Sequence, residues 1–254
     1  MAPSDVAEII SAGIRESVAG WRGATKYREP LLGSAAADDR RFAVLRKVVN
    51  PRHMLPDDLV TGARSVVSFF LPFDDEVVRA NAAVEGEAAR EWVLAYLETN
   101  ALIEQVTGGL IELLARNGVR AAAEPPSGRF DRHTLTSTWS HKSVAVIAGL
   151  GSFGVHRMAI TDSGCAGRFG SLVLDCEPPW GGREPTERCL HIASGGCLEC
   201  VKRCPVGALS GDGAIDRQLC WASCRRVAEK HDGLGNAAVC GKCALGPCSL
   251  RAAV

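Results

Sequence analysis

The stretch CLECVKRCP, residues 197–205, decides what the last quarter of this chain is built around. Nine of the eleven cysteines lie between Cys189 and Cys248. Thiolates gather in a sequence when they converge on one inorganic centre, and the candidates are zinc, disulfides and an iron–sulfur cluster. A C-x2-C-x3-C-P run is typical of 4Fe-4S ligands, whereas structural zinc prefers two C-x2-C pairs separated by a long loop. The spacing therefore predicts an iron–sulfur protein, and a tail held by zinc or disulfides is the alternative.

A second run, CGKCALGPC at residues 240–248, repeats the first with one extra residue before its last cysteine. The duplication predicts two clusters, and in two-cluster ferredoxins the last cysteine of each run binds the other cluster. The full run starts with one further cysteine, whose position here is Ser194, so Cys189 is the expected replacement. The expected ligands are Cys189, Cys197, Cys200 and Cys248 for the first cluster, and Cys204, Cys220, Cys240 and Cys243 for the second. Cys224 is an alternative to Cys220.

Length and composition indicate one substantial domain followed by a small one. The chain has 254 residues, of which 46% are hydrophobic, and its formal net charge is zero. A neutral chain has no global field that would recruit nucleic acid, so none is expected as a partner. No apolar run reaches the length of a membrane span, and the first residues lack the features of a signal peptide. We therefore expect no membrane partner and a cytoplasmic location, where free thiols persist.

Apolar spacing predicts the elements before the cysteines. Helices are expected over residues 4–20, 38–49 and 87–117, and strands over residues 65–71, 119–123 and 171–174. The apolar run SVVSFFL at residues 65–71 reads as a buried strand of a parallel-type core. Residues 177–188, rich in proline and glycine, read as a linker. The fold class is thus α+β or α/β, with a larger domain over residues 1–180 and a cluster domain over residues 181–254.

A glycine-rich loop, GLGSFG at residues 149–154, has two readings. After an apolar strand it would be a dinucleotide fingerprint, with Asp175 placed to hold a ribose, and the protein would be a nicotinamide-dependent dehydrogenase. Too few residues follow Gly154 for the helix that this motif needs. Residues 137–148 can equally form a helix that ends at Gly149.

Several segments together resemble the epoxyqueuosine reductase-like iron–sulfur proteins, which are relatives of reductive dehalogenases. They are DDL at residues 57–59, GARSVV at 62–67, Trp139-Ser-His141-Lys142, AGLG at 148–151, GCAGRFGSL at 164–172 and the cysteine runs. The resemblance covers the chain from about Asp39 onward. It implies a nitroreductase-like domain that holds base-off cobalamin, with FMN as the alternative cofactor, and a dicluster ferredoxin domain that supplies electrons.

The same resemblance implies which residues approach the cofactor. They are Gly149, Leu150, Gly151 and Gly154 in the first loop, and Cys165, Gly167, Arg168, Phe169 and Gly170 in a second segment. Residues 167–170 are expected to form a turn. Cys165 is either a redox-active thiol, a contact of the corrinoid or a small buried side chain, and Cys176 is expected to be the last of these. Arg168 is expected either to bind a polar group of the cofactor or to form a structural ion pair.

The chain also departs from the family pattern. The aspartate that donates a proton in epoxyqueuosine reductases would lie near Leu135 here, and Asp131 is the nearest acid, so Asp131, His133 and His141 are the candidate catalytic residues. The family's tRNA-binding extension would follow Val254, where this sequence stops, so a small-molecule substrate is expected. An external donor of the ferredoxin or flavodoxin type would supply electrons. The alternative is a non-catalytic electron carrier that reduces the corrinoid of a partner protein.

Overall fold

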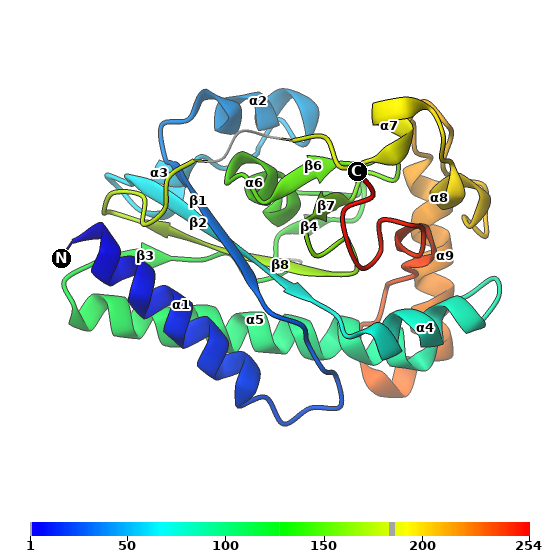
Figure 1. Cartoon of the computed structure of the whole chain (residues 1–254), viewed down its shortest axis with the longest axis horizontal. Coiled ribbons are helices and arrows are strands. Elements are labelled where there is room, and N and C mark those ends of the chain that lie inside the picture. The colour runs from blue at the N-terminus through cyan, green and yellow to red at the C-terminus, as the bar shows by residue number, and fades with distance from the viewer. Residues whose placement is uncertain (1, 127, 183–185) are drawn as a thin grey trace.

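The computed structural model describes residues 2–126, 128–182 and 186–254. Its centre is a four-stranded sheet in the order β1-β2-β8-β3, in which each neighbouring pair is antiparallel (Figure 1). The strands are β1 (Leu31–Ala36), β2 (Ser65–Pro72), β8 (Gly167–Leu174) and β3 (Ala121–Ala122). The strand β2 is buried along its whole length and forms the core of the sheet.

Helices cover both faces of this sheet. Alternate residues of β2, among them Val67 and Phe69, pack against α1 (Pro3–Ala19) and α5 (Arg90–Arg116). Val66, on the other face, packs with α2 (Arg40–Val48) and α6 (His141–Ile147). The elements from α1 to β8 therefore form a first unit, a sheet between two helical layers. Figure 1 shows α1 and α5 below the sheet and α2 and α6 above it.

The expected parallel-type core is wrong, because the sheet is antiparallel. The apolar run of β2 reflects burial on both faces, which a helix layer on each side produces regardless of strand direction. The expected long helices are present as α1, α2 and α5. The sequence did not reveal β1, an edge strand, or the helices α3 (Pro56–Leu59) and α4 (Asp75–Ala83).

Two small hairpins flank α6. The first joins β4 (Phe130–Asp131) to β5 (Thr136–Ser137), and the second joins β6 (Gly151–Phe153) to β7 (Ala159–Thr161). Because α6 is a helix and β6 pairs antiparallel with β7, the strand–turn–helix unit of a dinucleotide site is absent from this described segment. The nicotinamide reading of the glycine loop is therefore wrong.

In the cysteine-rich tail, residues 186–254, the helix α9 is accompanied by four shorter helices. In chain order, these helices are α7 (Leu190–Ser194), α8 (Glu199–Lys202), α9 (Arg217–Lys230), η1 (Asp232–Leu234) and η2 (Lys242–Ala244). In Figure 1 they lie at the right-hand end of the sheet, beside α4 and the start of α5. Of the expected linker, residues 183–185 lie outside the described residues.

The tail shares a hydrophobic core with the first unit. Phe73 and Trp92 from the first unit pack in one cluster with Val227 and Leu245 from the tail. Polar contacts reinforce it: Arg28 donates to the carbonyls of Phe73, Ser163 and Leu250 at 2.9, 2.8 and 2.8 Å. The tail is therefore docked on the first unit by both packing and hydrogen bonds.

Buried Lys242 fixes the second cysteine run to α4. Its ammonium group donates to the carbonyls of Asn81 and Val84, at the end of that helix. The side chain of Asn81 in turn donates to the carbonyl of Cys240 at 3.3 Å. These bonds give the last carbonyls of α4 a partner and hold the loop that carries Cys240 and Cys243.

None of the helices in the described ranges combines the length and the apolar composition that crossing a bilayer requires.

Candidate functional site

Four cysteines of the tail line one small cavity. Cys189 directly precedes α7, Cys197 and Cys200 lie around the start of α8, and Cys248 lies in the C-terminal segment. Gly195 ends α7 in the left-handed conformation, with φ of 74°, and turns the chain back so that the next cysteines face the same space. The structure thus brings together the four cysteines expected to bind the first cluster.

A second cavity, of about 220 Å³, is lined by the other cysteines of the tail. These are Cys204, Cys220, Cys224, Cys240 and Cys243. Two of them lie one turn apart on α9, and two lie on either side of Gly241, whose φ of 72° gives a tight left-handed bend. The four cysteines expected to bind the second cluster therefore meet here, together with Cys224.

The pair on α9 is not symmetric. The Cys224 thiol donates a hydrogen bond to the Cys220 sulfur, which lowers the pKa of Cys220 to about 7 and raises that of Cys224. The ammonium group of Lys142 lowers the pKa of Cys220 further. Of the two, Cys220 is the sulfur that carries negative charge most readily, which is the state of a metal ligand.

Burial raises the pKa of three other thiols, those of Cys200, Cys240 and Cys243, so they resist ionisation without a cation. Burial, followed by repulsion from Cys240, raises the pKa of Cys243, and burial raises the pKa of Cys200 to about 11. Several thiolates so close together are unfavourable unless a positive centre lies among them. A 4Fe-4S cluster uses four thiols, and each cavity offers at least that number, so these residues fit such clusters.

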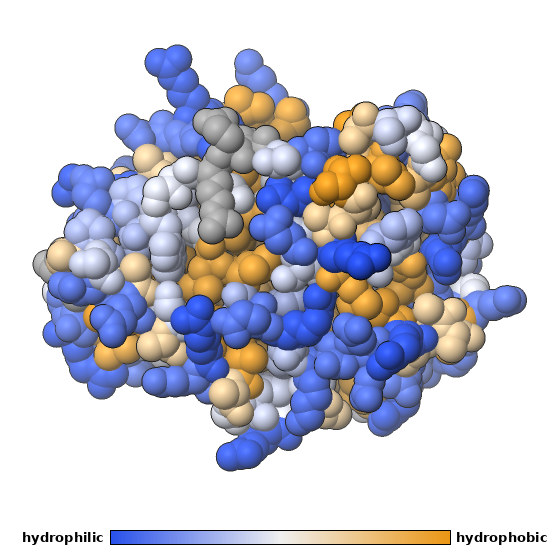
Figure 2. Space-filling model, in the orientation of Figure 1, coloured by the Kyte–Doolittle hydropathy of each residue, from blue (hydrophilic) through white to orange (hydrophobic). Residues whose placement is uncertain are grey.

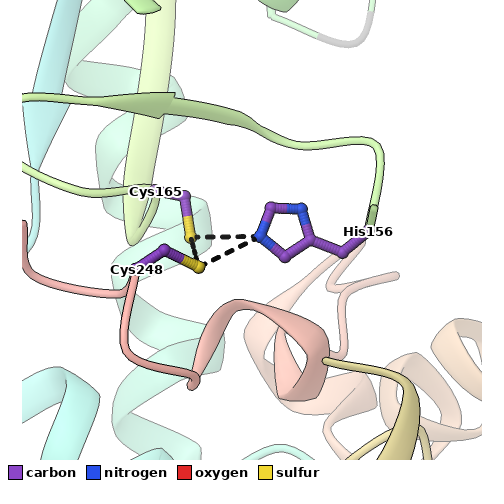
Figure 3. A group of neighbouring side chains, drawn as sticks. All are labelled: His156, Cys165 and Cys248. Atoms are coloured by element: carbon purple, nitrogen blue, oxygen red, sulfur yellow. Dashed lines mark hydrogen bonds between the residues drawn. The ribbon is translucent and has the colours of Figure 1, made fainter. Parts of the chain in front are cut away.

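One thiol of the first set has two further neighbours, shown in Figure 3. The Nε2 atom of His156 lies 3.4 Å from the Cys248 sulfur and 3.7 Å from the Cys165 sulfur, and the two sulfurs are 3.9 Å apart. A hydrogen bond from Cys165, with a smaller effect from His156, lowers the pKa of Cys248 to about 5. Sequence reasoning missed His156, because it lies far from the cysteine runs between β6 and β7, and no spacing marks it.

A large cavity of about 790 Å³ lies between the first unit and α9. Its walls come from α2, from the β4–β5 hairpin, from the start of α6 and from α9. Aromatic side chains contribute on both sides, with Phe130 and Trp221 in contact at a ring-centroid distance of 5.3 Å. Cys220 and Cys224 line this cavity as well as the second cysteine cavity, so the two share a wall.

Two of the three candidate catalytic residues lie away from the described lining of this cavity. The Asp131 carboxylate accepts hydrogen bonds from the backbone of His133 and Thr134, at 2.8 and 3.3 Å, and lies 3.3 Å from the Arg52 guanidinium. These bonds close the turn of the β4–β5 hairpin and lower the pKa of Asp131. Leu135, at the tip of this hairpin with φ of 54°, lines the cavity instead.

His141 does line the large cavity, but its ring is already engaged. The Trp139 indole donates to the Ser171 hydroxyl at 2.9 Å, and that hydroxyl shares a hydrogen bond with Nδ1 of His141, also at 2.9 Å. The carbonyls of Glu124 and Pro125 bond to the ring as well. Burial lowers the pKa of His141 to about 4, so the ring is neutral at pH 7.

Four glycines of the two segments expected to bind the cofactor pack closely against other residues of the chain. A Cβ atom on Gly151 would lie 2.0 Å from the Ile160 carbonyl, one on Gly167 2.4 Å from the Leu71 carbonyl, and one on Gly170 2.2 Å from the Phe69 ring. A Cβ on Gly154 would also meet Ile160, at 2.8 Å. The glycines permit close packing of neighbouring strands, and the segment with Gly167 and Gly170 is the strand β8, which corrects the expected turn.

The other residues of these segments divide among three places. Gly149 ends α6 with φ of 77°, and Leu150 and Phe169 are buried in a core cluster with Phe70. Gly167 and Arg168 line the second cysteine cavity, where the Arg168 guanidinium lies 4.2 Å from the centre of the Tyr96 ring. Of the first loop, Phe153 is the described residue that reaches the large cavity. Cys176 packs against the main core.

No family model matches the chain. In sequence, the chain is similar to an epoxyqueuosine reductase of Bacillus cereus, with 26% identity over 184 residues, which are 70% of this chain and 43% of that protein. The match thus spans less than half of the length of this relative.

Solved structures extend the likeness to the fold. A structure of epoxyqueuosine reductase with an epoxyqueuosine-modified tRNA-Tyr stem loop has a TM-score of 0.60 at 18% identity and covers 96% of this chain and 66% of that one. A reductive dehalogenase whose structure suggests a mechanism for B12-dependent dehalogenation has a TM-score of 0.56 at 16% identity, covering 91% and 30%. The chain is therefore a relative of epoxyqueuosine reductase in sequence, and it has a mixed α/β fold similar to those of epoxyqueuosine reductases and reductive dehalogenases.

Proposed function

We propose that this protein is an iron–sulfur oxidoreductase that passes electrons through two 4Fe-4S clusters to a cofactor in the large cavity, where a small molecule is reduced. One observation carries the proposal. The cysteines separate into two cavities that match the two expected ligand sets, and the second set shares a wall with the large cavity. Residues 1–180 would hold the cofactor and residues 181–254 the clusters, as in a nitroreductase-like domain followed by a ferredoxin domain.

The order of electron flow follows from this arrangement. The first set has no member in the described lining of the large cavity, whereas Cys220 of the second set belongs to it. Electrons would therefore enter at the first cluster and leave from the second. Figure 2 shows apolar residues at the upper right, where Figure 1 places α7, and Ile192 of this helix is 52% exposed. An external donor of the ferredoxin or flavodoxin type would approach the first cluster on this side.

Cobalamin is the cofactor that we propose for the large cavity, with FMN as the alternative. The walls fit a broad, flat group: Trp139, Trp221 and Phe153 offer apolar faces, and Arg157 and Arg217 offer cations for polar substituents. A bound corrinoid would supply a metal centre for difficult reductions, a chemistry that the side chains lack. The reductive dehalogenase of similar fold, whose structure suggests a mechanism for B12-dependent dehalogenation, supports this choice.

A reduction also needs protons, and the cavity wall offers one cationic acid near the second cysteine set. Lys142 lines the large cavity, and its ammonium group donates to the Arg157 carbonyl at 2.9 Å. Burial lowers the pKa of Lys142, which makes its ammonium a better proton donor. His141, neutral and engaged on both sides, would instead shape the wall beside the substrate.

The proposal is tested by anaerobic reconstitution with iron, sulfide and hydroxocobalamin, followed by desalting. About eight irons per chain, as two 4Fe-4S clusters require, together with retained corrinoid absorption would support it. Trp221→Ala should keep the iron and lose corrinoid, because Trp221 lies in the wall of the large cavity. Eight irons with bound FMN, or with neither cofactor, would favour a flavin enzyme or an electron carrier that reduces a partner's corrinoid.

The substrate class is tested separately. The neutral net charge of the chain supports a small molecule over a tRNA. Loaded protein would be incubated with a chemical reductant and either a panel of halogenated and epoxide-bearing small molecules or an epoxyqueuosine-modified tRNA stem loop. Turnover of the stem loop alone would contradict the small-molecule assignment while leaving the redox function intact.

A further inference from the structure

Cys248 differs from the other cysteines of the first set in its surroundings. His156 and Cys165 come from the loops before and after β7, and their side chains converge on its sulfur in Figure 3. Both side chains are buried, at 4% and 1% exposure. The backbone supports the contact, since the Cys165 amide donates to the Cys248 carbonyl at 2.9 Å. The first unit thus contacts Cys248, a proposed ligand of a cluster whose other ligands all belong to the tail.

The direction of the histidine hydrogen bond is fixed by its other nitrogen. The backbone N–H of Met158 donates to Nδ1 of His156 at 3.1 Å, so Nδ1 acts as the acceptor. In a neutral imidazole the hydrogen is then on Nε2, the atom 3.4 Å from the Cys248 sulfur. His156 is therefore an N–H donor to this sulfur. The Cys165 thiol is a second donor, at 3.9 Å.

We propose that His156 and Cys165 raise the reduction potential of the first cluster by donating hydrogen bonds to its ligand Cys248. Hydrogen bonds to cluster sulfurs are among the factors that set the potential, because they draw electron density from the sulfur and stabilise the reduced state. His156 and Cys165 are positioning residues in this role. The inference rests on the proposed function, since it requires a cluster at Cys248.

The two clusters would differ in consequence. No imidazole is found in the described lining of the second cysteine cavity, where the donors are the Cys224 thiol to Cys220 and the Ala208 amide to Cys204, at 3.2 Å. A raised potential at the first cluster makes it the easier one to reduce. It would therefore take up electrons from an external donor before the second cluster, which lies next to the cofactor, does.

Direct ligation is the competing arrangement. The ligand atoms of His156, Cys165 and Cys248 all lie within 4.8 Å of one another, which a single tetrahedral metal ion also requires. Cys248, however, shares its cavity with Cys189, Cys197 and Cys200, which completes a four-thiolate set without the histidine. The hydrogen-bonding role leaves that set whole, and we therefore prefer it.

The first experiment is a potentiometric titration of the reconstituted protein, followed by electron paramagnetic resonance. His156→Leu removes the donor and should lower the potential of one cluster, while the other cluster serves as the internal control. His156→Gln keeps an N–H group of similar reach and should restore part of the shift. Cys165→Ala should cause a smaller decrease than His156→Leu, and Cys165→Ser should cause almost none. Unchanged potentials in His156→Leu would overturn the proposal.

A second measurement needs only the wild-type chain, so it holds even if the variants fold poorly. Protein labelled with ¹⁵N-histidine, reduced and studied by pulsed electron paramagnetic resonance, should show a weak nitrogen coupling to one cluster. A strong coupling, or a loss of about four irons in His156→Leu, would mean that His156 is a ligand and would overturn the proposal. Wild-type protein without iron would instead refute the proposed function itself.

Discussion

At the scale of single residues, Cys220 and Cys224 face the same two cavities, yet they should contribute differently. Cys220 accepts a hydrogen bond from Cys224 and lies near the Lys142 ammonium, so it is the better thiolate. Cys220→Ala should therefore lower the iron content from about eight to about four per chain, whereas Cys224→Ala should keep about eight. Iron and acid-labile sulfide assays would measure this. Loss of iron in Cys224→Ala alone would reverse the assignment.

His141 should make stability depend on pH. Burial holds its pKa at about 4 in the folded chain, below the ordinary value of 6.5, so the folded protein binds the proton less well than the unfolded one. The part of the free energy of unfolding that depends on the neutral His141 ring is fully present above pH 6.5 and is lost as the pH falls toward 4. Near pH 5.5 the free energy of unfolding should be about 1 kcal/mol lower than near pH 7.5 because of this residue.

Denaturant unfolding of the wild type and of His141→Gln at both pH values would measure the effect. The variant should be less stable near neutral pH, because the hydrogen bond with Ser171 is lost, and it should lose less stability on acidification. Equal pH slopes in the two proteins would show that the ring is not held neutral by the fold.

The cysteines could be predicted as site residues from the sequence, whereas His156 could not. Repeated spacing marks the cysteines, because a C-x2-C pair can supply two ligands of one cluster from one short segment. His156 and Leu135 reach their cavities through the packing of hairpins that are distant in sequence from α8 and α9. Their places depend on tertiary contacts that leave no periodic pattern in the chain.

At the scale of elements, the loop that carries Cys240 and Cys243 depends on contact with α5. A Cβ atom on Gly241 would lie 2.1 Å from the Trp92 ring, and the residue has φ of 72°. Gly241→Ala should therefore displace the loop and lower the iron content to about four per chain. The matched control is Gly207→Ala, with φ of 63° and no atom within 4 Å, which should cost about 1 kcal/mol of backbone strain and keep the iron.

Some helices and strands could be predicted from the local sequence pattern, whereas the pairing of the strands could not. The helices α1, α2 and α5 were predictable because each presents an apolar stripe to the sheet. The strand β2 was predictable, but not its partners, since strand direction depends on which distant segments pair with it. The glycine loop misled for a related reason: Gly151 and Gly154 permit the close approach of Ile160 in β7 rather than of a ligand.

At the scale of the whole molecule, the first unit and the tail should unfold together. They share the core around Phe73 and Trp92, and Arg28 joins three segments by donating to the carbonyls of Phe73, Ser163 and Leu250. Arg28→Met should lower the free energy of unfolding by about 3 kcal/mol, because buried carbonyls lose a charged donor. The exposed pair of Arg64 with Glu177 offers the control, and Arg64→Met should cost less than about 1 kcal/mol.

Far-ultraviolet circular dichroism and cluster absorbance would follow these transitions. Coincident midpoints in the wild type, shifted together in Arg28→Met, are expected from the shared core. A cluster signal that disappears well before the helical signal would show instead that the tail opens as an independent unit.

The placement of Cys248 has a consequence for the timing of assembly. Every ligand of the second set lies between Cys200 and Cys248 in the sequence, so the two sets are nested. During synthesis from the N-terminus, the ribosome delivers all four sulfurs of the inner cluster before the last sulfur of the outer one. With the proposed ligand sets, the inner cluster would close first and shorten the chain between Cys200 and Cys248, which would reduce the loop entropy that the outer cluster must overcome.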